Sequence, residues 1–216
     1  MKAINSLVLD FGNVITLPPD EAVIDRMVHE VMGGPKRAGG GKARRAPFLA
    51  VYSAFRNEYD RGTLSAADYW RTVGSALGAD LSPSAIDRLR TLDTECWFRF
   101  DPAMVAWFQS LRPGLRHLAL LSNINEDGVS ALHRRASWLG IFDLLVFSCE
   151  HRVLKPEPEI YRLLIEGLGV EPVHCLFVDD LEENVEGAKA AGLNTHRYTG
   201  MAGLQAEFGD LYRLAR

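Results

Sequence analysis

Four polar motifs follow one another in a fixed order along this chain. Three of them, Asp10, Ser122-Asn123 and Asp179-Asp180, each end a run of apolar residues, and a Lys155-Pro156 pair lies between the last two. Short apolar runs that end in polar residues are typical of buried parallel strands. The carboxyl ends of such strands form the ligand-binding edge of an open α/β sheet. We therefore expect the four motifs to meet in one crevice.

The second half of the chain alternates between two kinds of segment. Amphipathic segments predict helices, short apolar segments predict strands, and such alternation is typical of right-handed βαβ units. The helices are expected at 102–112, 127–139, 157–168, 182–191 and 203–214, and the strands at 117–122, 143–148, 174–179 and 194–198. Together with a first strand at 6–10, this pattern predicts an α/β fold with a Rossmann-like parallel sheet and helices on both faces.

Residues 17–100, between the first two expected strands, indicate helices instead. Segments 21–32 and 47–59 have amphipathic spacing, and Ser65 and Ser82 stand where helix N-caps are expected. We therefore expect a helical cap at 17–100, inserted into a core formed by 1–16 and 101–216.

Segment 33–46, GGPKRAGGGKARRA, is rich in glycine and in basic residues. So much glycine disfavours a regular element, and a mobile loop between the first two cap helices is expected. Such a loop is most simply a solvated surface segment, and the alternative is a cationic lip over an anionic substrate.

Composition narrows the partners and the compartment. A net charge of −4 gives no reason to expect nucleic acid or an anionic membrane as partner. The apolar run that follows Met1 is too short for a signal peptide or a membrane span. Cys96, Cys149 and Cys175 are too scattered for a disulfide framework or a metal knuckle, so buried free thiols are expected. We expect a cytoplasmic protein.

The motifs suit phosphoryl transfer. Asp10 can attack phosphorus, Ser122 with backbone amides can hold phosphoryl oxygens, and Lys155 can neutralise charge. Paired carboxylates such as Asp179-Asp180 are oxygen ligands that suit Mg²⁺. Taken singly, each motif also has a structural interpretation, as a turn cap or a solvated surface lysine.

Jointly, the four motifs resemble those of the haloacid dehalogenase-like hydrolase superfamily, over almost the whole chain. The resemblance implies a Rossmann-like core with a helical cap, Asp10 as nucleophile, Ser122 and Asn123 as phosphate-binding residues, and Lys155 as the group that stabilises charge. It also implies Mg²⁺ as cofactor, held by Asp10, the Gly12 carbonyl and the pair Asp179-Asp180, with Asp180 as the direct ligand. The strings DFGNVI, LLSNIN and VDDLEENVEGA are similar to bacterial sugar-phosphate phosphatases of the α-glucose-1-phosphate type.

One position departs from the family pattern. Phosphatases and mutases of the family carry a second Asp two residues after the nucleophile, as general acid, and here that position is Gly12. General acid–base catalysis contributes roughly 10²–10⁴-fold, so phosphomutase activity is doubtful. Glu150, His151, water or the substrate itself are the alternatives for this role.

These observations predict a Mg²⁺-dependent phosphatase acting on a small phosphorylated metabolite. A 2-haloacid dehalogenase is the first alternative, although the acidic pair argues against it because family dehalogenases generally lack that pair. A non-catalytic binding module is the second. Substrate specificity is expected from the cap, where the candidates are Arg56, Tyr59, Arg61, Trp70, Trp97 and Arg99.

Overall fold

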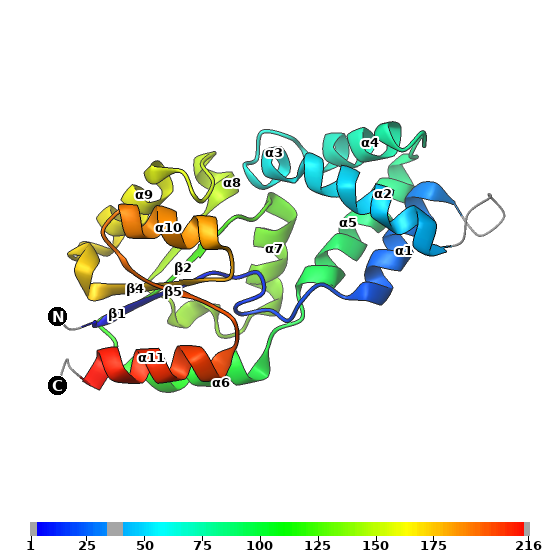
Figure 1. The fold of residues 1–216 in the computed structure, drawn as a ribbon. Coiled ribbons are helices and arrows are strands. Elements are labelled where there is room, and N and C mark those ends of the chain that lie inside the picture. The colour runs from blue at the N-terminus through cyan, green and yellow to red at the C-terminus, as the bar shows by residue number, and fades with distance from the viewer. Residues whose placement is uncertain (1–3, 34–40, 214–216) are drawn as a thin grey trace.

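A five-stranded parallel sheet forms the centre of the structure, a computed structural model that describes residues 4–33 and 41–213 (Figure 1). Its strands are β1 (Ser6–Leu9), β2 (His117–Ser122), β3 (Leu144–Phe147), β4 (Cys175–Asp179) and β5 (Asn194–Arg197). The order across the sheet is β3-β2-β1-β4-β5, and all neighbouring pairs are parallel. β2 and β3 lie on one side of β1, whereas β4 and β5 lie on the other, so the carboxyl ends of β1, β2 and β4 border one crevice.

Helices cover both faces of this sheet. They are α6 (Pro102–Leu111), α7 (Glu126–Arg135), the short α8 (Ser148–His151), α9 (Pro158–Leu168), α10 (Glu182–Ala190) and α11 (Met201–Arg213). Side chains alternate between the faces along a strand, so Leu7 and Leu9 pack with α6, α7 and α11 while Val8 packs with α9 and α10. The α/β fold predicted from the sequence is confirmed.

The chain between β1 and α6 forms a separate group of helices. They are α1 (Glu21–Met32), α2 (Gly41–Ala54), α3 (Arg56–Asp60), α4 (Ala66–Ala76) and α5 (Pro83–Trp97). This group has an apolar core of its own, which includes Met27, Trp70 and Leu89, and it lies beyond the carboxyl end of β1 (Figure 1). The expected N-caps are present, since Ser65 accepts from the Asp68 N–H and Ser82 from the Ala85 N–H. The division at residues 17–100 stays a prediction.

The two chain segments that connect this group to the sheet run side by side. Thr16 and Phe100 form an antiparallel bridge. The Leu17 N–H donates to the Arg99 carbonyl at 2.7 Å, and the Asp101 N–H donates to the Ile15 carbonyl at 2.8 Å. The helical group is therefore attached through one short two-stranded connection.

The prediction of a loop at 33–46 is wrong for residues 41–46, which are helical. Residues 34–40 lie outside the described residues. Helix α2 begins at Gly41 and runs through the expected loop to Ala54. Packing overrides the weak helix propensity of glycine, because Phe48 and Tyr52 on this helix are buried in the helical group. Arg45 forms ion pairs with Glu21 and Asp25 of α1 instead of projecting over the sheet.

Candidate active site

Asp10 and Lys155 form a buried ion pair at the carboxyl ends of the strands. Asp10 directly follows β1, and its N–H donates to the Val178 carbonyl at 2.9 Å, which fixes it beside β4. Lys155 Nζ lies 2.6 Å from Asp10 Oδ1 and 2.6 Å from Asp179 Oδ2. It also donates to the Leu121 carbonyl of β2, and the residue is only 4% exposed. One cation therefore ties together the ends of three strands.

Asn123 holds Lys155 in this position through two hydrogen bonds. Its Nδ2 donates to the Lys155 carbonyl at 3.0 Å, and its Oδ1 accepts from the Lys155 N–H at 2.8 Å. Pro156, which follows Lys155, packs closely against Gly187 of α10. A Cβ at position 187 would lie only 2.9 Å from the Pro156 Cβ, so a side chain there would prevent this approach. Ser122 is buried at the end of β2 and is not among the residues that line the cavity described below. The phosphate-binding roles of Ser122 and Asn123 stay predictions.

The two neighbouring aspartates at the end of β4 have different surroundings. The Asp179 carboxylate is completely buried, and it accepts from Lys155 Nζ, from Asn184 Nδ2 at 3.0 Å and from the Leu181 N–H at 2.9 Å. Asp180 accepts from Asn13 Nδ2 at 2.9 Å and lines the cavity. Asp179 is therefore committed to protein donors, whereas Asp180 is open to a ligand.

Carboxylates outnumber cations at this point. The oxygens of Asp10, Asp179 and Asp180 include atoms that all lie within 4.8 Å of one another. Burial raises the pKa of Asp10 above its usual range, although Lys155 opposes the shift, and burial also raises the pKa of Asp180. Burial alone would lower the pKa of Lys155, but Asp10 and Asp179 outweigh it and raise that pKa. Three carboxylates thus share one ammonium group, and the site lacks positive charge.

The residues present fit a magnesium ion. The available donors are oxygen atoms, which Mg²⁺ prefers. Two further oxygens, Asn13 Oδ1 and Asn184 Oδ1, are buried beside the acidic group and have no hydrogen-bond partner among the described residues. Asp10, Asp180 and the carbonyl of Gly12 are the groups that would hold the ion. It would supply the missing positive charge and polarise a phosphoryl oxygen.

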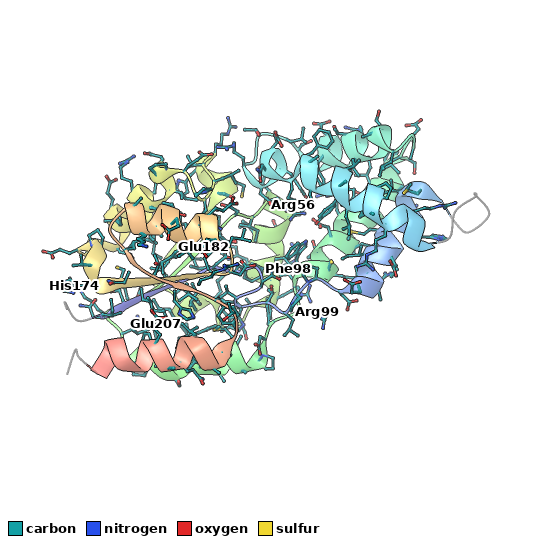
Figure 2. All side chains as sticks on the ribbon, in the orientation of Figure 1. Arg56, Phe98, Arg99, His174, Glu182 and Glu207 are labelled. Carbon is teal, nitrogen blue, oxygen red and sulfur yellow. The ribbon has the colours of Figure 1, made fainter. Side chains whose placement is uncertain are left out.

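A cavity of about 540 Å³ opens over Asp10 and is closed on its far side by the cap helices. Figure 2 shows Arg56, one of its lining residues, in the helical group at the end nearer the sheet. The lining residues from the cap include Arg56, Asn57, Asp60, Asp93, Thr94 and Trp97. Those from the core include Asp10, Gly12, Asn13, Asn123, Asn125, Lys155, Asp180 and Glu183.

Two of the six cap residues named from the sequence line this cavity, Arg56 and Trp97. The other four have different positions. Tyr59 donates to Asp127 of α7, and Arg61 forms an ion pair with Glu157 ahead of α9. Trp70 is fully buried in the core of the cap, and Arg99 pairs with Asp20 beside the connection to the sheet.

Neither side chain suggested as a substitute general acid lies in the cavity. Glu150 and His151 are exposed on α8, and the cavity lining contains neither of them. Two cap carboxylates that do line it, Asp60 and Asp93, were not predicted from the sequence. Asp93 could have been found, because it continues the apolar stripe of Ile86, Leu89 and Cys96 on α5.

Curated relatives of the chain include both phosphatases and dehalogenases. Phosphatase MT3486 of Mycobacterium tuberculosis is 31% identical over 118 residues, which are 54% of this chain and 54% of that protein. The (S)-2-haloacid dehalogenase of Xanthobacter autotrophicus is 39% identical over 136 residues, 61% of this chain and 53% of that one. A phosphorylated carbohydrates phosphatase of Thermotoga maritima is 40% identical over 76 residues, 35% of either chain. The chain thus spans about half the length, or less, of these relatives.

Solved structures share the whole fold. A HAD family enzyme of Bacteroides thetaiotaomicron superposes with a TM-score of 0.74 over 96% of this chain and 99% of its own, at 21% identity. The same enzyme in complex with magnesium and inorganic phosphate gives a TM-score of 0.69 at 20% identity, over 93% of this chain and 96% of its own. A family model described as haloacid dehalogenase-like hydrolase matches residues 4–192. This match confirms the resemblance seen in the motifs, and the chain belongs to the haloacid dehalogenase-like hydrolases.

Proposed function

We propose that the protein is a magnesium-dependent phosphatase that hydrolyses a small phosphate monoester, preferably of a sugar, through an aspartyl-phosphate on Asp10. The observation that carries this proposal is the shared ammonium group of Lys155 between Asp10 and Asp179, with Asp180 open beside them. Two relatives are named as phosphatases, one of them for phosphorylated carbohydrates. An enzyme of the same fold binds magnesium and inorganic phosphate.

The reaction divides into two displacements at phosphorus. Lys155 holds Asp10 Oδ1, which leaves Oδ2 to attack the phosphorus while the ester P–O bond breaks. The leaving alcohol takes its proton from water, because Gly12 has no side chain to supply one. Hydroxide from that water then attacks the phosphorus of the aspartyl-phosphate, the bond to Asp10 breaks, and phosphate leaves. One water is consumed, and Lys155 offsets the charge of both displacements.

A 2-haloacid dehalogenase is the second candidate, because a dehalogenase relative is 39% identical over its matched stretch. In that reaction Asp10 would displace a halide from carbon, and no metal would be needed. The cluster of Asp10, Asp179 and Asp180 favours the phosphatase, since three close carboxylates with one ammonium group suit a metal ion, which phosphoryl transfer uses and halide displacement does not need.

Product release distinguishes the two candidates. Phosphate release from aryl phosphates and phosphorylated metabolites, and chloride release from 2-chloropropionate, are measured with added Mg²⁺ and with excess chelator. We expect phosphate release that requires Mg²⁺ and is lost in Asp10→Asn. The control is Asp87→Asn, an exposed change outside the cavity, which should release phosphate at the rate of the wild type. Chloride release, full activity in chelator, or undiminished turnover by Asp10→Asn would overturn the proposal, and no turnover of any substrate would favour a binding module.

Metal binding can be tested without turnover. Asp180→Asn removes charge from the proposed ion site, so calorimetric titration with Mg²⁺ is expected to show an affinity at least about tenfold weaker than that of the wild type. Glu186→Gln, an exposed change on α10, is the matched control. Unchanged Mg²⁺ affinity in Asp180→Asn would mean that the acidic pair is structural.

A further inference from the structure

The cap wall of the cavity contains a cation whose charge is already balanced. Arg56 on α3 donates from Nε to Asp60 Oδ2 at 2.9 Å, and from Nη1 to both oxygens of Asp93 at 3.1 and 3.0 Å. Its Nη1 also donates to the Tyr52 hydroxyl at 2.6 Å. Burial would lower the pKa of Arg56, but Asp60 and Asp93 outweigh it and raise that pKa, so the guanidinium stays charged. Arg56 therefore has little charge left for an anionic ligand.

The other cation in the cavity is balanced as well. Lys155 is bound by Asp10 and Asp179. Among the described residues that line the cavity, Arg56 and Lys155 are the only Lys or Arg side chains. The same lining contains five carboxylates, those of Asp10, Asp60, Asp93, Asp180 and Glu183. One phosphate group at Asp10 would be offset by Lys155 and the proposed metal ion. A second anionic group would meet Asp60 and Asp93 without a free cation.

The same wall offers good partners for an uncharged molecule. The carboxylates of Asp60 and Asp93 accept hydrogen bonds from hydroxyl groups, and Asn57 and Thr94 add further polar atoms. The ring of Trp97 lies over the nucleophile loop, with Cζ3 3.9 Å from where a Gly12 Cβ would be. An apolar ring surrounded by hydrogen-bond acceptors suits a hydroxylated ring or chain.

We propose that Asp60 and Asp93 determine specificity by occupying Arg56, so that the enzyme selects phosphate monoesters with an uncharged, hydroxylated leaving group and rejects bisphosphates and phosphorylated carboxylic acids. This inference rests on the proposed phosphatase function. Its cause is electrostatic: a second negative charge within a few ångströms of two carboxylates, screened only by a half-closed cavity, weakens binding about tenfold or more.

Two pairs of substrates that differ by one charge test the wild type. Glucose 1-phosphate is compared with glucuronic acid 1-phosphate, and 4-carbamoylphenyl phosphate with 4-carboxyphenyl phosphate. In each pair that is hydrolysed, we expect kcat/KM to be at least about tenfold higher for the substrate whose leaving group has no carboxylate, here called the neutral member. Equal values in either pair overturn the inference but leave the phosphatase function standing. Absence of phosphate release from every aryl phosphate would instead refute the proposed function.

Variants then assign the effect to Arg56 and its partners. Asp93→Asn and Asp60→Asn each keep the shape of the wall and release part of the charge of Arg56. We expect kcat/KM for the anionic member to rise in absolute terms and the neutral-to-anionic ratio to fall at least about fivefold. Asp87→Asn makes the same change of charge on α5 outside the cavity and should leave the ratio unchanged. A folding defect lowers both rates together, so a rate for the anionic substrate that rises in neither variant overturns the inference.

Discussion

Lys155 performs two tasks in this structure. It neutralises the proposed nucleophile, and it also joins the ends of β1, β2 and β4 through Asp10, the Leu121 carbonyl and Asp179. A buried ion pair gives little net stability, but the loss of one partner leaves the other charge uncompensated. The residue therefore matters for folding as well as for chemistry.

Lys155→Met is expected to destabilise the fold by about 3–5 kcal/mol in the presence of chelator. Burial already raises the pKa of Asp10. A group with a raised folded-state pKa contributes stability that is present below its unfolded pKa and is lost as pH rises through the folded one. The deficit of the variant should therefore shrink as pH falls from about 8 to about 5. Urea denaturation at both pH values measures the difference in the free energy of unfolding between the variant and the wild type, with the exposed Lys189→Met as control. A difference that does not change with pH would contradict this account.

Gly12 marks the missing general acid, and its backbone does not require glycine. Its φ lies outside the left-handed region, whereas the neighbouring Asn13 has a φ of 55°. A side chain at position 12 would make only an ordinary contact with Trp97.

Without that acid, we expect the wild type to hydrolyse glucose 1-phosphate faster than glucose 6-phosphate, because a hemiacetal hydroxyl leaves with less protonation than an ordinary alcohol. Gly12→Asp should raise kcat/KM for the 6-phosphate by about tenfold or more, and Gly12→Asn, of the same size but without a proton to give, should not. Steady-state kinetics at one pH decide the question. Equal values for the two phosphates in the wild type would show that another group supplies the proton.

The sequence predicted Asp10, Lys155 and the acidic pair of the site, but of the cap residues that line the cavity it indicated only Arg56 and Trp97. Asp10, Lys155 and the pair Asp179-Asp180 could be placed because apolar runs define where strands end, and parallel strands end at the same edge. Asp60 and Asp93 reach the cavity through the packing of helices on one another. The pattern of a single helix gives its buried face, but it does not say which partner that face meets.

At the scale of elements, α7 is one of the parts of the core that hold the cap. Asp127 on α7 accepts from Arg90 Nε and Nη2 of α5, each at 2.7 Å, and from the Tyr59 hydroxyl of α3 at 3.1 Å. The hydrogen bond from Arg90 is the main reason why the pKa of Asp127 is lowered. Two cap helices are thus bound to one core helix through a single carboxylate.

Asp127→Asn is expected to lower the free energy of unfolding by about 1 kcal/mol, a modest loss because Arg90 is partly exposed and solvent screens the pair. A looser cap should also raise KM more than it lowers kcat. Asp87→Asn, which removes a longer contact with the same arginine, is the matched control. Identical urea midpoints and KM values in the two variants would show that Asp127 does not hold the cap.

Helices show where local patterns fail as predictors. The glycines of segment 33–46 predicted a loop, yet residues 41–46 belong to α2, because Phe48 and Tyr52 further along that helix are buried in the cap. The helix expected over 127–139 ends at Arg135. Its last turn is replaced by a turn and a short 3-10 helix (Leu139–Ile141), and the Trp138 ring packs against Phe108 and Phe142. In both places tertiary packing outweighs local propensity.

Over the whole molecule, the three cysteines are buried free thiols, so their reaction with a thiol reagent is a measure of how often the fold opens. Burial raises the pKa of Cys96 and of Cys175 to about 11 and that of Cys149 to about 12. Since the thiolate is the reactive form, none of them should react with a thiol reagent at about pH 7.5 unless the fold opens. Mass spectrometry after labelling in buffer and in urea tests this, and rapid labelling of any one in buffer would contradict it.

No helix in the part of the chain that the structure describes is both long enough and apolar enough to cross a membrane. The motifs predicted the order of the large parts, a sheet with an inserted group of helices. They did not predict how the insertion closes on the sheet, because that depends on contacts such as those of Asp127 and Arg61 with residues distant in sequence.

The paired segments at Thr16 and Phe100 have a consequence for how such a chain can change. Because Thr16 and Phe100 form a bridge, the chain leaves the core and returns to it at the same point. Residues 17–99 therefore form one loop whose two ends are held together. The entropy of closing a loop rises only logarithmically, by about 0.6 kcal/mol for each doubling of its length. An insertion here can therefore grow, shrink or be exchanged at small cost to the sheet. A short turn in its place would join the two segments as a hairpin. Asp10 would then be exposed to solvent, and the cap residues that line the cavity would no longer select the substrate.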